Sequence, residues 1–178
     1  MIRKPMFGQL IAVSLVLFAA LFMALASGAQ AQQALQPFGG GMMAPEIALS
    51  NLDDEAVTLE QYRGKVVIVN FWATWCPPCR KEMPSMQRAW LDLQENDVMM
   101  LAVHVGGNAD QVWQFVSEFD LDFPILIDDT SKVSRSWPMR GLPTTFVIAP
   151  DGKIAYMAIG GREWDDPGIL QAIYALKE

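Results

Sequence analysis

Residues 66–84, VVIVNFWATWCPPCRKEMP, join a strongly apolar run to a pair of closely spaced cysteines. The run 65–72 is β-branched and apolar on both faces, a pattern that predicts a central strand covered by helices on either side. Beyond the cysteines, apolar residues recur at the spacing of one helical face, which predicts a helix over 76–95 that Pro84 should kink. The recurring residues are Met83, Met86, Trp90 and Leu93. The cysteine pair therefore stands where a buried strand passes into a helix.

Cys76 and Cys79 are separated by two residues, which brings both sulfurs within bonding range across the first turn of the predicted helix. At the helix N-terminus Cys76 faces unpaired backbone N–H groups, which stabilise a thiolate and lower the thiol pKa from ~8.5 into the range ~3.5 to 7.5. Cys79, one turn further in, is predicted to be the shielded resolving thiol. Pro77 and Pro78 stiffen the turn and have no N–H to donate. This arrangement is typical of a redox-active pair.

Two other uses of the cysteines are disfavoured by the rest of the sequence. A zinc site needs two more Cys or His ligands, and His104 is the only histidine. A purely structural disulfide would close too small a loop to stabilise a chain of this length. The single histidine also excludes a two-histidine metal site and argues against a Ser-His-Asp or Cys-His hydrolase. His104 is predicted to be a satisfied structural residue of a strand, and no cofactor or metal is predicted.

The composition limits the function classes further. The chain has 178 residues, 52% of them hydrophobic, which fits one folded domain with a short additional segment. Its net charge is −7, and its basic residues form no stripe. Nucleic-acid binding relies on clustered Lys and Arg side chains, so a nucleic-acid partner is not expected.

The first 31 residues have the layout of a secretory signal. Arg3 and Lys4 precede an apolar run over 10–26, and Ala29-Gln30-Ala31 has the small-residue pattern of a cleavage site. The alternative is an uncleaved membrane anchor, because a helix of this length spans about 25 Å, close to the hydrocarbon thickness of a bilayer. In either case the domain is expected to face an exported compartment such as the periplasm, where disulfides are permitted. Removing the leader takes the net charge to about −9.

The remainder of the chain alternates predicted strands and helices behind a linker. Residues 32–43 include three consecutive glycines, so we predict a flexible linker there and a folded domain over 44–178. Strands are predicted at 46–49, 56–58, 98–105, 123–127, 144–148 and 154–159. Helices are predicted at 59–63, 109–119, 131–137 and 167–176. The alternation indicates an α/β fold with a mainly parallel centre and an antiparallel edge.

The run 69–84, taken together with RGLPTTF at 140–146, resembles the TlpA/ResA/CcmG group of exported thioredoxin-like proteins. The resemblance covers about residues 44–176, and the paired motifs are highly specific. It implies a thioredoxin fold, a central mixed sheet flanked by helices, with an N-terminal β-hairpin and a central αβ insert that corresponds to 109–127. It also implies that Pro143 is a cis-proline packed against the disulfide.

The same resemblance gives a role to Glu82, which falls where the family places a buried acid near the cysteine pair. A carboxylate one helical turn beyond Cys79 could take up or return its proton during thiol exchange. The alternative for Glu82 is an exposed helix acid that pairs with a neighbouring base. Asn70 stands where thioredoxin itself has a buried aspartate, which suggests that the proton-relay role belongs to Glu82 here.

These features predict an exported thiol-disulfide oxidoreductase in which Cys76 attacks a substrate disulfide and Cys79 releases the product. The resemblance implies a disulfide-containing protein as substrate, for example in the maturation of cytochrome c or of an oxidase copper site. It also implies a membrane thiol donor of the DsbD/CcdA type, and we expect a monomer.

Two alternatives to this function stay open. One is a net disulfide oxidant or isomerase, although a DsbA-like oxidant would carry a larger helical insertion before Pro143. The other is a non-catalytic module that docks an apoprotein or handles copper. Thioethers suit Cu(I), but most methionines stand at core spacings, which favours core packing. A peroxiredoxin is excluded, because its Pro-x-x-x-Thr-x-x-Cys motif would need Pro and Thr where Val69 and Ala73 stand.

Overall fold

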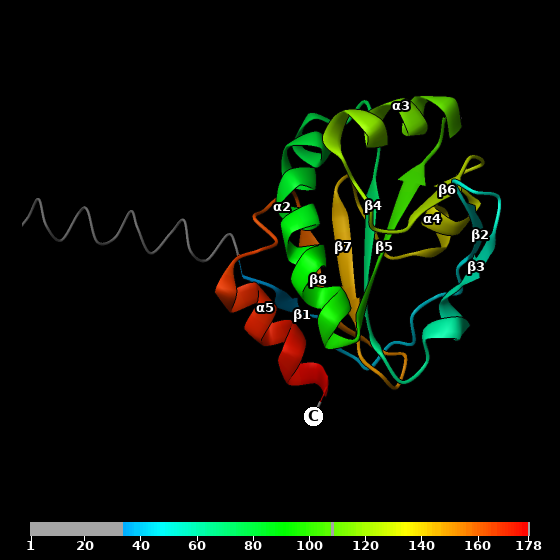
Figure 1. Ribbon diagram of the computed structural model, residues 1–178. Coiled ribbons are helices and arrows are strands. Elements are labelled where there is room, and N and C mark those ends of the chain that lie inside the picture. The colour runs from blue at the N-terminus through cyan, green and yellow to red at the C-terminus, as the bar shows by residue number, and fades with distance from the viewer. Residues whose placement is uncertain (1–33, 108, 178) are drawn as a thin grey trace, which may run out of the picture. The chain divides into compact units, whose positions relative to one another are not determined.

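The computed structural model describes residues 34–107 and 109–177, and the predicted leader 1–31 lies outside them. An eight-stranded sheet in the order β1-β8-β7-β4-β5-β6-β2-β3 organises the described part (Figure 1). Its strands are β1 Gln36–Pro37, β2 Ala48–Asn51, β3 Ala56–Thr58, β4 Val66–Trp72, β5 Val98–Val105, β6 Ile125–Asp128, β7 Thr144–Ile148 and β8 Ile154–Ile159. No helix of these described residues is long and apolar enough to cross a membrane.

The pairing of β4 gives the sheet its mixed character. β4 pairs in parallel with β5 and antiparallel with β7, and β5 pairs in parallel with β6. β8 continues the sheet antiparallel to β7, while the hairpin of β2 and β3 pairs antiparallel with β6. This is the mixed α/β sheet, with an N-terminal hairpin and an αβ insert, that the sequence and the resemblance predict.

The helices agree closely with the predicted ones. They are α2 Pro77–Leu93, α3 Ala109–Phe119, α4 Lys132–Ser136 and α5 Pro167–Tyr174, with 3-10 turns η1 Leu59–Tyr62, η2 Gln94–Asn96 and η3 Ala175–Lys177. Pro77 and Pro78 occupy the first two positions of α2, where a missing N–H costs nothing, and Pro84 lies inside the helix. The predicted bounds of β5, α3, β7 and β8 are confirmed.

Side chains of β4 alternate between two cores, which explains why the strand is apolar at almost every position. Ile68 and Trp72 point to one face of the sheet and pack with residues of α2, α3 and α5. Val69 and Phe71 point to the other face and pack with residues of α4 and η1. Every residue of β4 is buried, so the strand is a rigid base for the loop that follows it.

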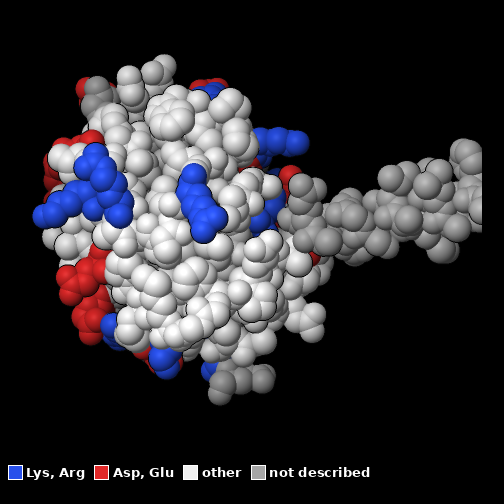
Figure 2. Space-filling model, turned by 180° about the vertical axis from the view of Figure 1, so that it is seen from behind, with Lys and Arg blue, Asp and Glu red and all other residues white. Residues whose placement is uncertain are grey.

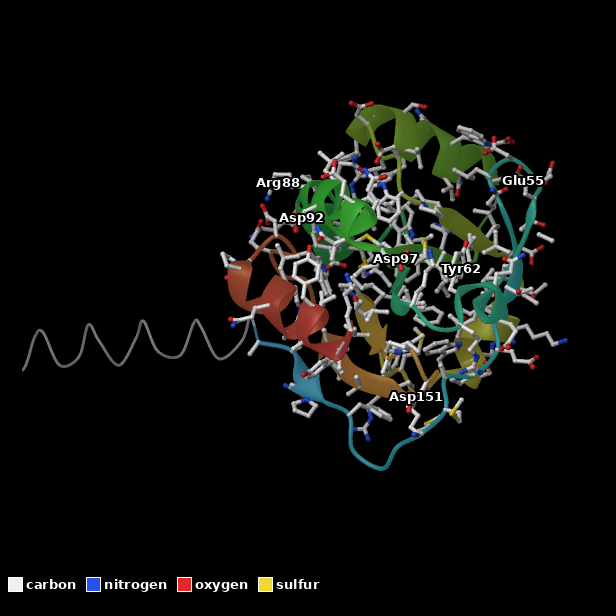
Figure 3. The ribbon with its side chains drawn as sticks, turned by 60° about the horizontal axis from the view of Figure 1, so that its bottom comes forward. Glu55, Tyr62, Arg88, Asp92, Asp97 and Asp151 are labelled. Atoms are coloured by element: carbon white, nitrogen blue, oxygen red, sulfur yellow. A yellow bond between two sulfur atoms is a disulfide. The ribbon has the colours of Figure 1, made fainter. Side chains whose placement is uncertain are left out.

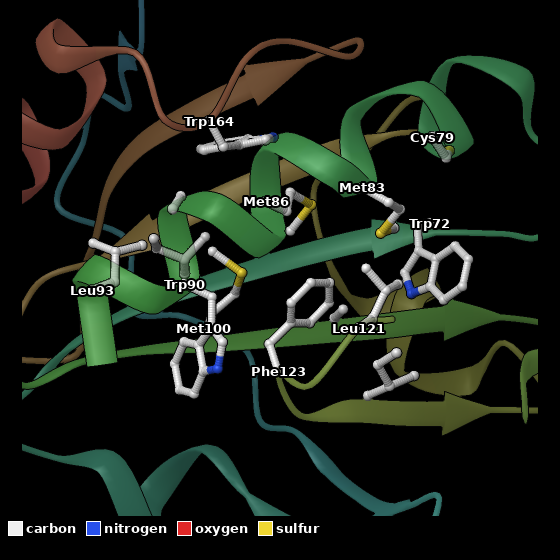
Figure 4. Packing of buried hydrophobic residues seen from close by; sticks show 14 of the residues in the cluster. Trp72, Cys79, Met83, Met86, Trp90, Leu93, Met100, Leu121, Phe123 and Trp164 are labelled. Atoms are coloured by element: carbon white, nitrogen blue, oxygen red, sulfur yellow. The ribbon is translucent and has the colours of Figure 1, made fainter. Parts of the chain in front are cut away.

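Three methionines fill the space between α2 and the sheet (Figure 4). Met83 and Met86 of α2 and Met100 of β5 are each fully buried. Trp164, from the segment before α5, belongs to the same hydrophobic cluster. The predicted core packing is therefore confirmed for these methionines.

The segment 35–43 differs from its prediction as a flexible linker. β1 pairs with β8, the Phe38 amide donates to the Ala155 carbonyl at 2.8 Å, and Met43 forms a bridge with Lys153. The Phe38 ring also packs edge-on against Phe146. The compact unit of the structure begins at Leu35, upstream of the boundary predicted at residue 44. The backbone groups of residues 35–43 form hydrogen bonds along the edge of β8. The glycine content of this segment gives no indication of such pairing.

The C-terminal segment is tied to α2 by polar contacts on the surface (Figure 3). Arg88 of α2 donates to both carboxylate oxygens of Asp165, at 2.6 and 3.2 Å, and Tyr174 of α5 donates to Asp92 of α2. These exposed contacts are individually weak. They nevertheless hold α5 beside α2 and orient the segment that carries Trp164.

Figure 2 shows the face of the molecule turned away from the view of Figure 1. Its Lys and Arg side chains lie in separate small groups, with uncharged surface between the groups. This face of the described part therefore presents no continuous basic surface.

Candidate active site

The cysteine pair lies at the first turn of α2 and is joined by a disulfide. The Cα atoms of Cys76 and Cys79 are 5.3 Å apart. Cys76 is the N-cap of the helix, with an extended backbone (φ −94°, ψ 106°), and its Sγ accepts a hydrogen bond from the Cys79 amide at 3.3 Å. Cys76 keeps 4% of its surface exposed whereas Cys79 keeps none. Of the two cysteines, Cys76 is therefore the one nearer to solvent.

A tight turn delivers the chain from β4 to α2. The Ala73 carbonyl accepts from the Cys76 amide at 3.1 Å, and the Cys76 carbonyl accepts from the Arg80 amide at 3.1 Å. Trp75, inside the turn, is 70% exposed. The buried strand and the helix therefore present an exposed aromatic ring immediately before Cys76.

Glu82 lies one turn beyond Cys79 and is buried among hydrogen-bond donors. Its Oε1 accepts from the side-chain amide of Asn70 at 3.0 Å. Its Oε2 accepts from the Trp164 indole at 3.1 Å and from the Arg162 backbone amide at 3.3 Å. Only 1% of its surface is exposed. The alternative of an exposed helix acid is therefore wrong.

Burial raises the pKa of Glu82 from 4.5 to about 7, because the charged carboxylate loses its hydration. Hydrogen bonds from Trp164, Asn70 and Arg162 oppose this effect, since each of these donors stabilises the ionised form. A carboxyl with a pKa near neutrality can both take up and release a proton at ordinary pH.

Pro143 is connected to the start of α2 by the segment that follows β8. The Leu142–Pro143 peptide bond has the cis geometry that the resemblance implies. The Pro143 carbonyl accepts from the Gly160 amide at 2.9 Å. A Cβ atom at Gly161 would lie 2.9 Å from the Pro78 carbonyl oxygen, so only glycine allows the backbone to approach this closely. Through these contacts Pro143 is linked, by way of Gly160 and Gly161, to Pro78 in the first turn of α2.

A cavity of about 480 Å³ opens beside the cysteine turn, between it and α3. Its walls include Thr74, Trp75, Arg80, Gln114 and Glu118. Arg80 spans this wall, with its guanidinium 4.8 Å from the centroid of the Phe115 ring and 3.8 Å from the Glu118 carboxylate. The αβ insert therefore forms one side of the space next to Cys76.

Two partners of Glu82 escaped the sequence analysis. Trp164 and Arg162 follow Glu82 by about eighty residues, and no local pattern marks them as part of a site. Asn70 stands where thioredoxin has a buried aspartate, and its side-chain amide donates to Glu82. Among the described residues, no group of three or more His, Cys, Asp or Glu side chains could hold a metal ion.

Comparisons with known proteins agree with this geometry. The model of the AhpC/TSA family matches residues 41–157. The thiol-disulfide oxidoreductase ResA of Geobacillus thermodenitrificans (strain NG80-2) is 39% identical over 137 residues, 77% of this chain and 78% of the relative. A ResA of Bacillus cereus is 36% identical over 134 residues, 75% of this chain and 78% of the relative.

Solved structures share the fold as well. The crystal structure of a thiol:disulfide interchange protein of the thioredoxin family from Chlorobium tepidum TLS has a TM-score of 0.67 and 25% sequence identity. The match covers 76% of this chain and 99% of that chain.

Replacing Glu82 by Gln should flatten the pH dependence of stability. The folded-state pKa of about 7 lies above the unfolded value of 4.5, so the neutral carboxyl stabilises the fold fully below pH 4.5 and this contribution is lost as pH rises through 7. Urea unfolding of the oxidised protein should show that Glu82→Gln removes roughly 3 kcal/mol of variation between pH 4 and 8. Glu95→Gln, at an exposed acid, is the control. Parallel pH profiles for wild type and Glu82→Gln would show that Glu82 keeps an ordinary acidity.

Proposed function

The chain belongs to the AhpC/TSA family and is a thiol-disulfide oxidoreductase with a thioredoxin fold, and we propose that it reduces protein disulfides in an exported compartment. The observation that carries the proposal is the position of the cysteine pair. Cys76 caps the N-terminus of α2 and keeps a small exposed area whereas Cys79 keeps none, so we assign the attack on the substrate to Cys76.

The proposed reaction has two exchange steps. In the first, the Cys76 thiolate attacks one sulfur of the substrate disulfide, a mixed disulfide forms, and the other substrate sulfur leaves as a thiolate that takes up a proton. In the second, the Cys79 thiolate attacks the Cys76 sulfur, which restores the Cys76–Cys79 disulfide and releases the second substrate thiol. Two electrons pass from the cysteine pair to the substrate disulfide, and each of the two substrate thiolates takes up one proton from water.

Glu82 is proposed to serve the second step as a proton relay. Cys79 is buried and must lose its proton before it can attack, and Glu82 follows it by one helical turn. With a pKa of about 7, the Glu82 carboxyl can accept that proton at neutral pH and return it when the pair is reduced again. We assign Pro143 to the same site because its carbonyl accepts a hydrogen bond from the Gly160 amide, and the next residue, Gly161, packs against the Pro78 carbonyl.

The sequence supports our proposals for the exported location and for the partners of the protein. The leader pattern in 1–31 and the resemblance to the TlpA/ResA/CcmG group support a periplasmic or otherwise extracytoplasmic domain, released or held by an N-terminal anchor. A reductant in an oxidising compartment must receive electrons, so we propose a membrane thiol donor of the DsbD/CcdA type. The proposed substrates are the cysteine pairs of apocytochrome c or of an oxidase copper site.

The division of labour between the two thiols can be tested by trapping. Cys79→Ser should accumulate a mixed disulfide with a protein substrate, because the sulfur that resolves it is missing. Cys76→Ser should accumulate none, since Cys79 is buried. Non-reducing electrophoresis and mass spectrometry of the adducts measure both outcomes. Trapping by Cys76→Ser instead would reverse the assigned roles.

The proton-relay role predicts a kinetic effect of Glu82→Gln on the folded enzyme. Removing a general acid or base slows its step by about a hundredfold or more, and the pH–rate profile should lose the ionisation near 7. Stopped-flow measurement of disulfide reduction between pH 5 and 9 tests both effects, with Glu95→Gln as the control. An unchanged pH–rate profile would contradict the relay.

The direction of electron flow depends on the reduction potential of the Cys76–Cys79 pair. A reductant should have a value near that of thioredoxin, about −270 mV, whereas an oxidant should lie near about −120 mV. Equilibrating residues 32–178 with glutathione redox buffers and counting free thiols by mass measures it. A value near −120 mV would make the protein a net oxidant.

A further inference from the structure

His104 lies near the end of β5 and contacts the turn that leads to Cys76. Its ring is fully buried, and its Nε2 accepts a hydrogen bond from the Thr74 amide at 3.2 Å. Thr74 lies inside the turn closed by the hydrogen bond from the Cys76 amide to the Ala73 carbonyl. A side chain of the neighbouring strand thus holds the backbone two residues before Cys76.

The other contacts of the imidazole do not explain why a polar side chain occupies this position. Its ring packs edge-on against Trp72, with 5.0 Å between the ring centroids. A Cβ atom at Gly107 would lie 3.2 Å from its Cε1. Its Nδ1 makes no hydrogen bond of good geometry among the described residues, and the Gly106 backbone is the polar group that acts on the ring. An apolar side chain would fill this place without leaving a buried nitrogen unpaired, so the contact with Thr74 is what distinguishes histidine here.

The contact with Thr74 requires the neutral ring in one tautomer. Because Nε2 accepts, the proton of the neutral imidazole lies on Nδ1. If Nε2 carried the proton, the Nε2–H and the Thr74 N–H would both be donors and could not form a hydrogen bond. Burial lowers the pKa of His104 from 6.5, against a smaller opposing effect of the Gly106 backbone, which keeps the ring in its accepting form.

The charged groups around the imidazole are engaged elsewhere. Its register neighbours on β4 and β6, Trp72 and Ile127, do not ionise. Asp128, next along β6, accepts from backbone amides at the start of α4. Arg80 of α2 lies over the Phe115 ring and pairs with Glu118 of α3.

We propose that His104 is a positioning residue for the active-site turn: its neutral imidazole holds the Thr74 amide and thereby sets the orientation of Cys76 at the N-terminus of α2. The inference rests on the proposed role of Cys76 as nucleophile. The chain of contacts is continuous, from the imidazole to the Thr74 amide, through the turn to the Cys76 amide, and from the Cys76 sulfur to the Cys79 amide. Loosening its first contact misaligns the cap and weakens the stabilisation of the Cys76 thiolate.

Two substitutions separate this role from simple core filling. His104→Leu keeps a similar volume but removes the acceptor, whereas His104→Gln places an amide oxygen within reach of the Thr74 amide. Met100→Leu, at another fully buried residue of β5, is the matched control. To measure the pKa of Cys76, each substitution is combined with Cys79→Ser and the rate of alkylation of Cys76 by iodoacetamide is followed across pH. Each substitution is also assayed alone for kcat and KM with a protein disulfide as substrate.

His104→Leu should raise the pKa of Cys76 by about half a unit or more and lower kcat about fivefold, since the hydrogen bond that holds the Thr74 amide is lost. His104→Gln should restore both values to within about twofold of wild type, and Met100→Leu should change neither. Equal values for wild type and His104→Leu, or equal losses for His104→Leu and His104→Gln, overturn the positioning role. A wild type that reduces no protein disulfide would instead overturn the proposed function.

A measurement on the wild-type chain does not depend on how the variants fold. The protein without a histidine tag has one histidine, so its imidazole nitrogens give a single pair of ¹⁵N NMR signals. The proposal requires the proton on Nδ1 and an unprotonated Nε2 at pH 7 in the oxidised protein. A proton on Nε2 overturns it.

Discussion

The hydrogen bond from the Cys79 amide to the Cys76 sulfur is the contact on which the rest of the site depends. Pro77 and Pro78 fill the first two positions of α2 and have no N–H, so Cys79 supplies the first amide of the helix that can donate. The helix N-terminus thus favours negative charge at one sulfur. Its position is set by β4, a strand buried on both faces, and by the short turn between strand and helix. A small shift in that turn would change the stability of the thiolate.

Most of the fold could be predicted because its elements bury side chains with a clear period. β4 is apolar at nearly every position, and α2 and α3 repeat apolar residues on one face, so their patterns identify them. The segment 35–43 could not be predicted in this way. It is held by main-chain pairing with β8, which has no side-chain signature, and its glycines indicate flexibility. Tertiary contact with an open sheet edge decided its conformation.

The candidate site could be predicted only as far as its motif extends. Cys76, Cys79 and Glu82 lie within seven residues of one another, and a single sequence places such neighbours on one helix. Trp164 reaches Glu82 from a distant segment, and His104 reaches the active-site turn from the adjacent strand. His104 was expected to be a structural residue of its strand, and the structure places its Nε2 against the Thr74 amide. The His104 contact depends on the register in which β5 pairs with β4. That register cannot be predicted from the identity of single residues.

Proton transfer between a thiol and a carboxyl is unfavourable in water, because their pKa values, about 8.5 and about 4.3, lie far apart. Burial raises the pKa of Glu82 to about 7, because it removes water from the charged carboxylate. The pKa of Glu82 therefore lies closer to that of a thiol than the pKa of an ordinary carboxyl does, and transfer of the Cys79 proton to Glu82 costs correspondingly less free energy. Cys76, at the helix N-terminus, is served in a different way, because the Cys79 amide stabilises negative charge on its sulfur. The start of α2 thus favours the thiolate that attacks, and the burial of its second turn provides the acceptor for the proton of the thiol that resolves.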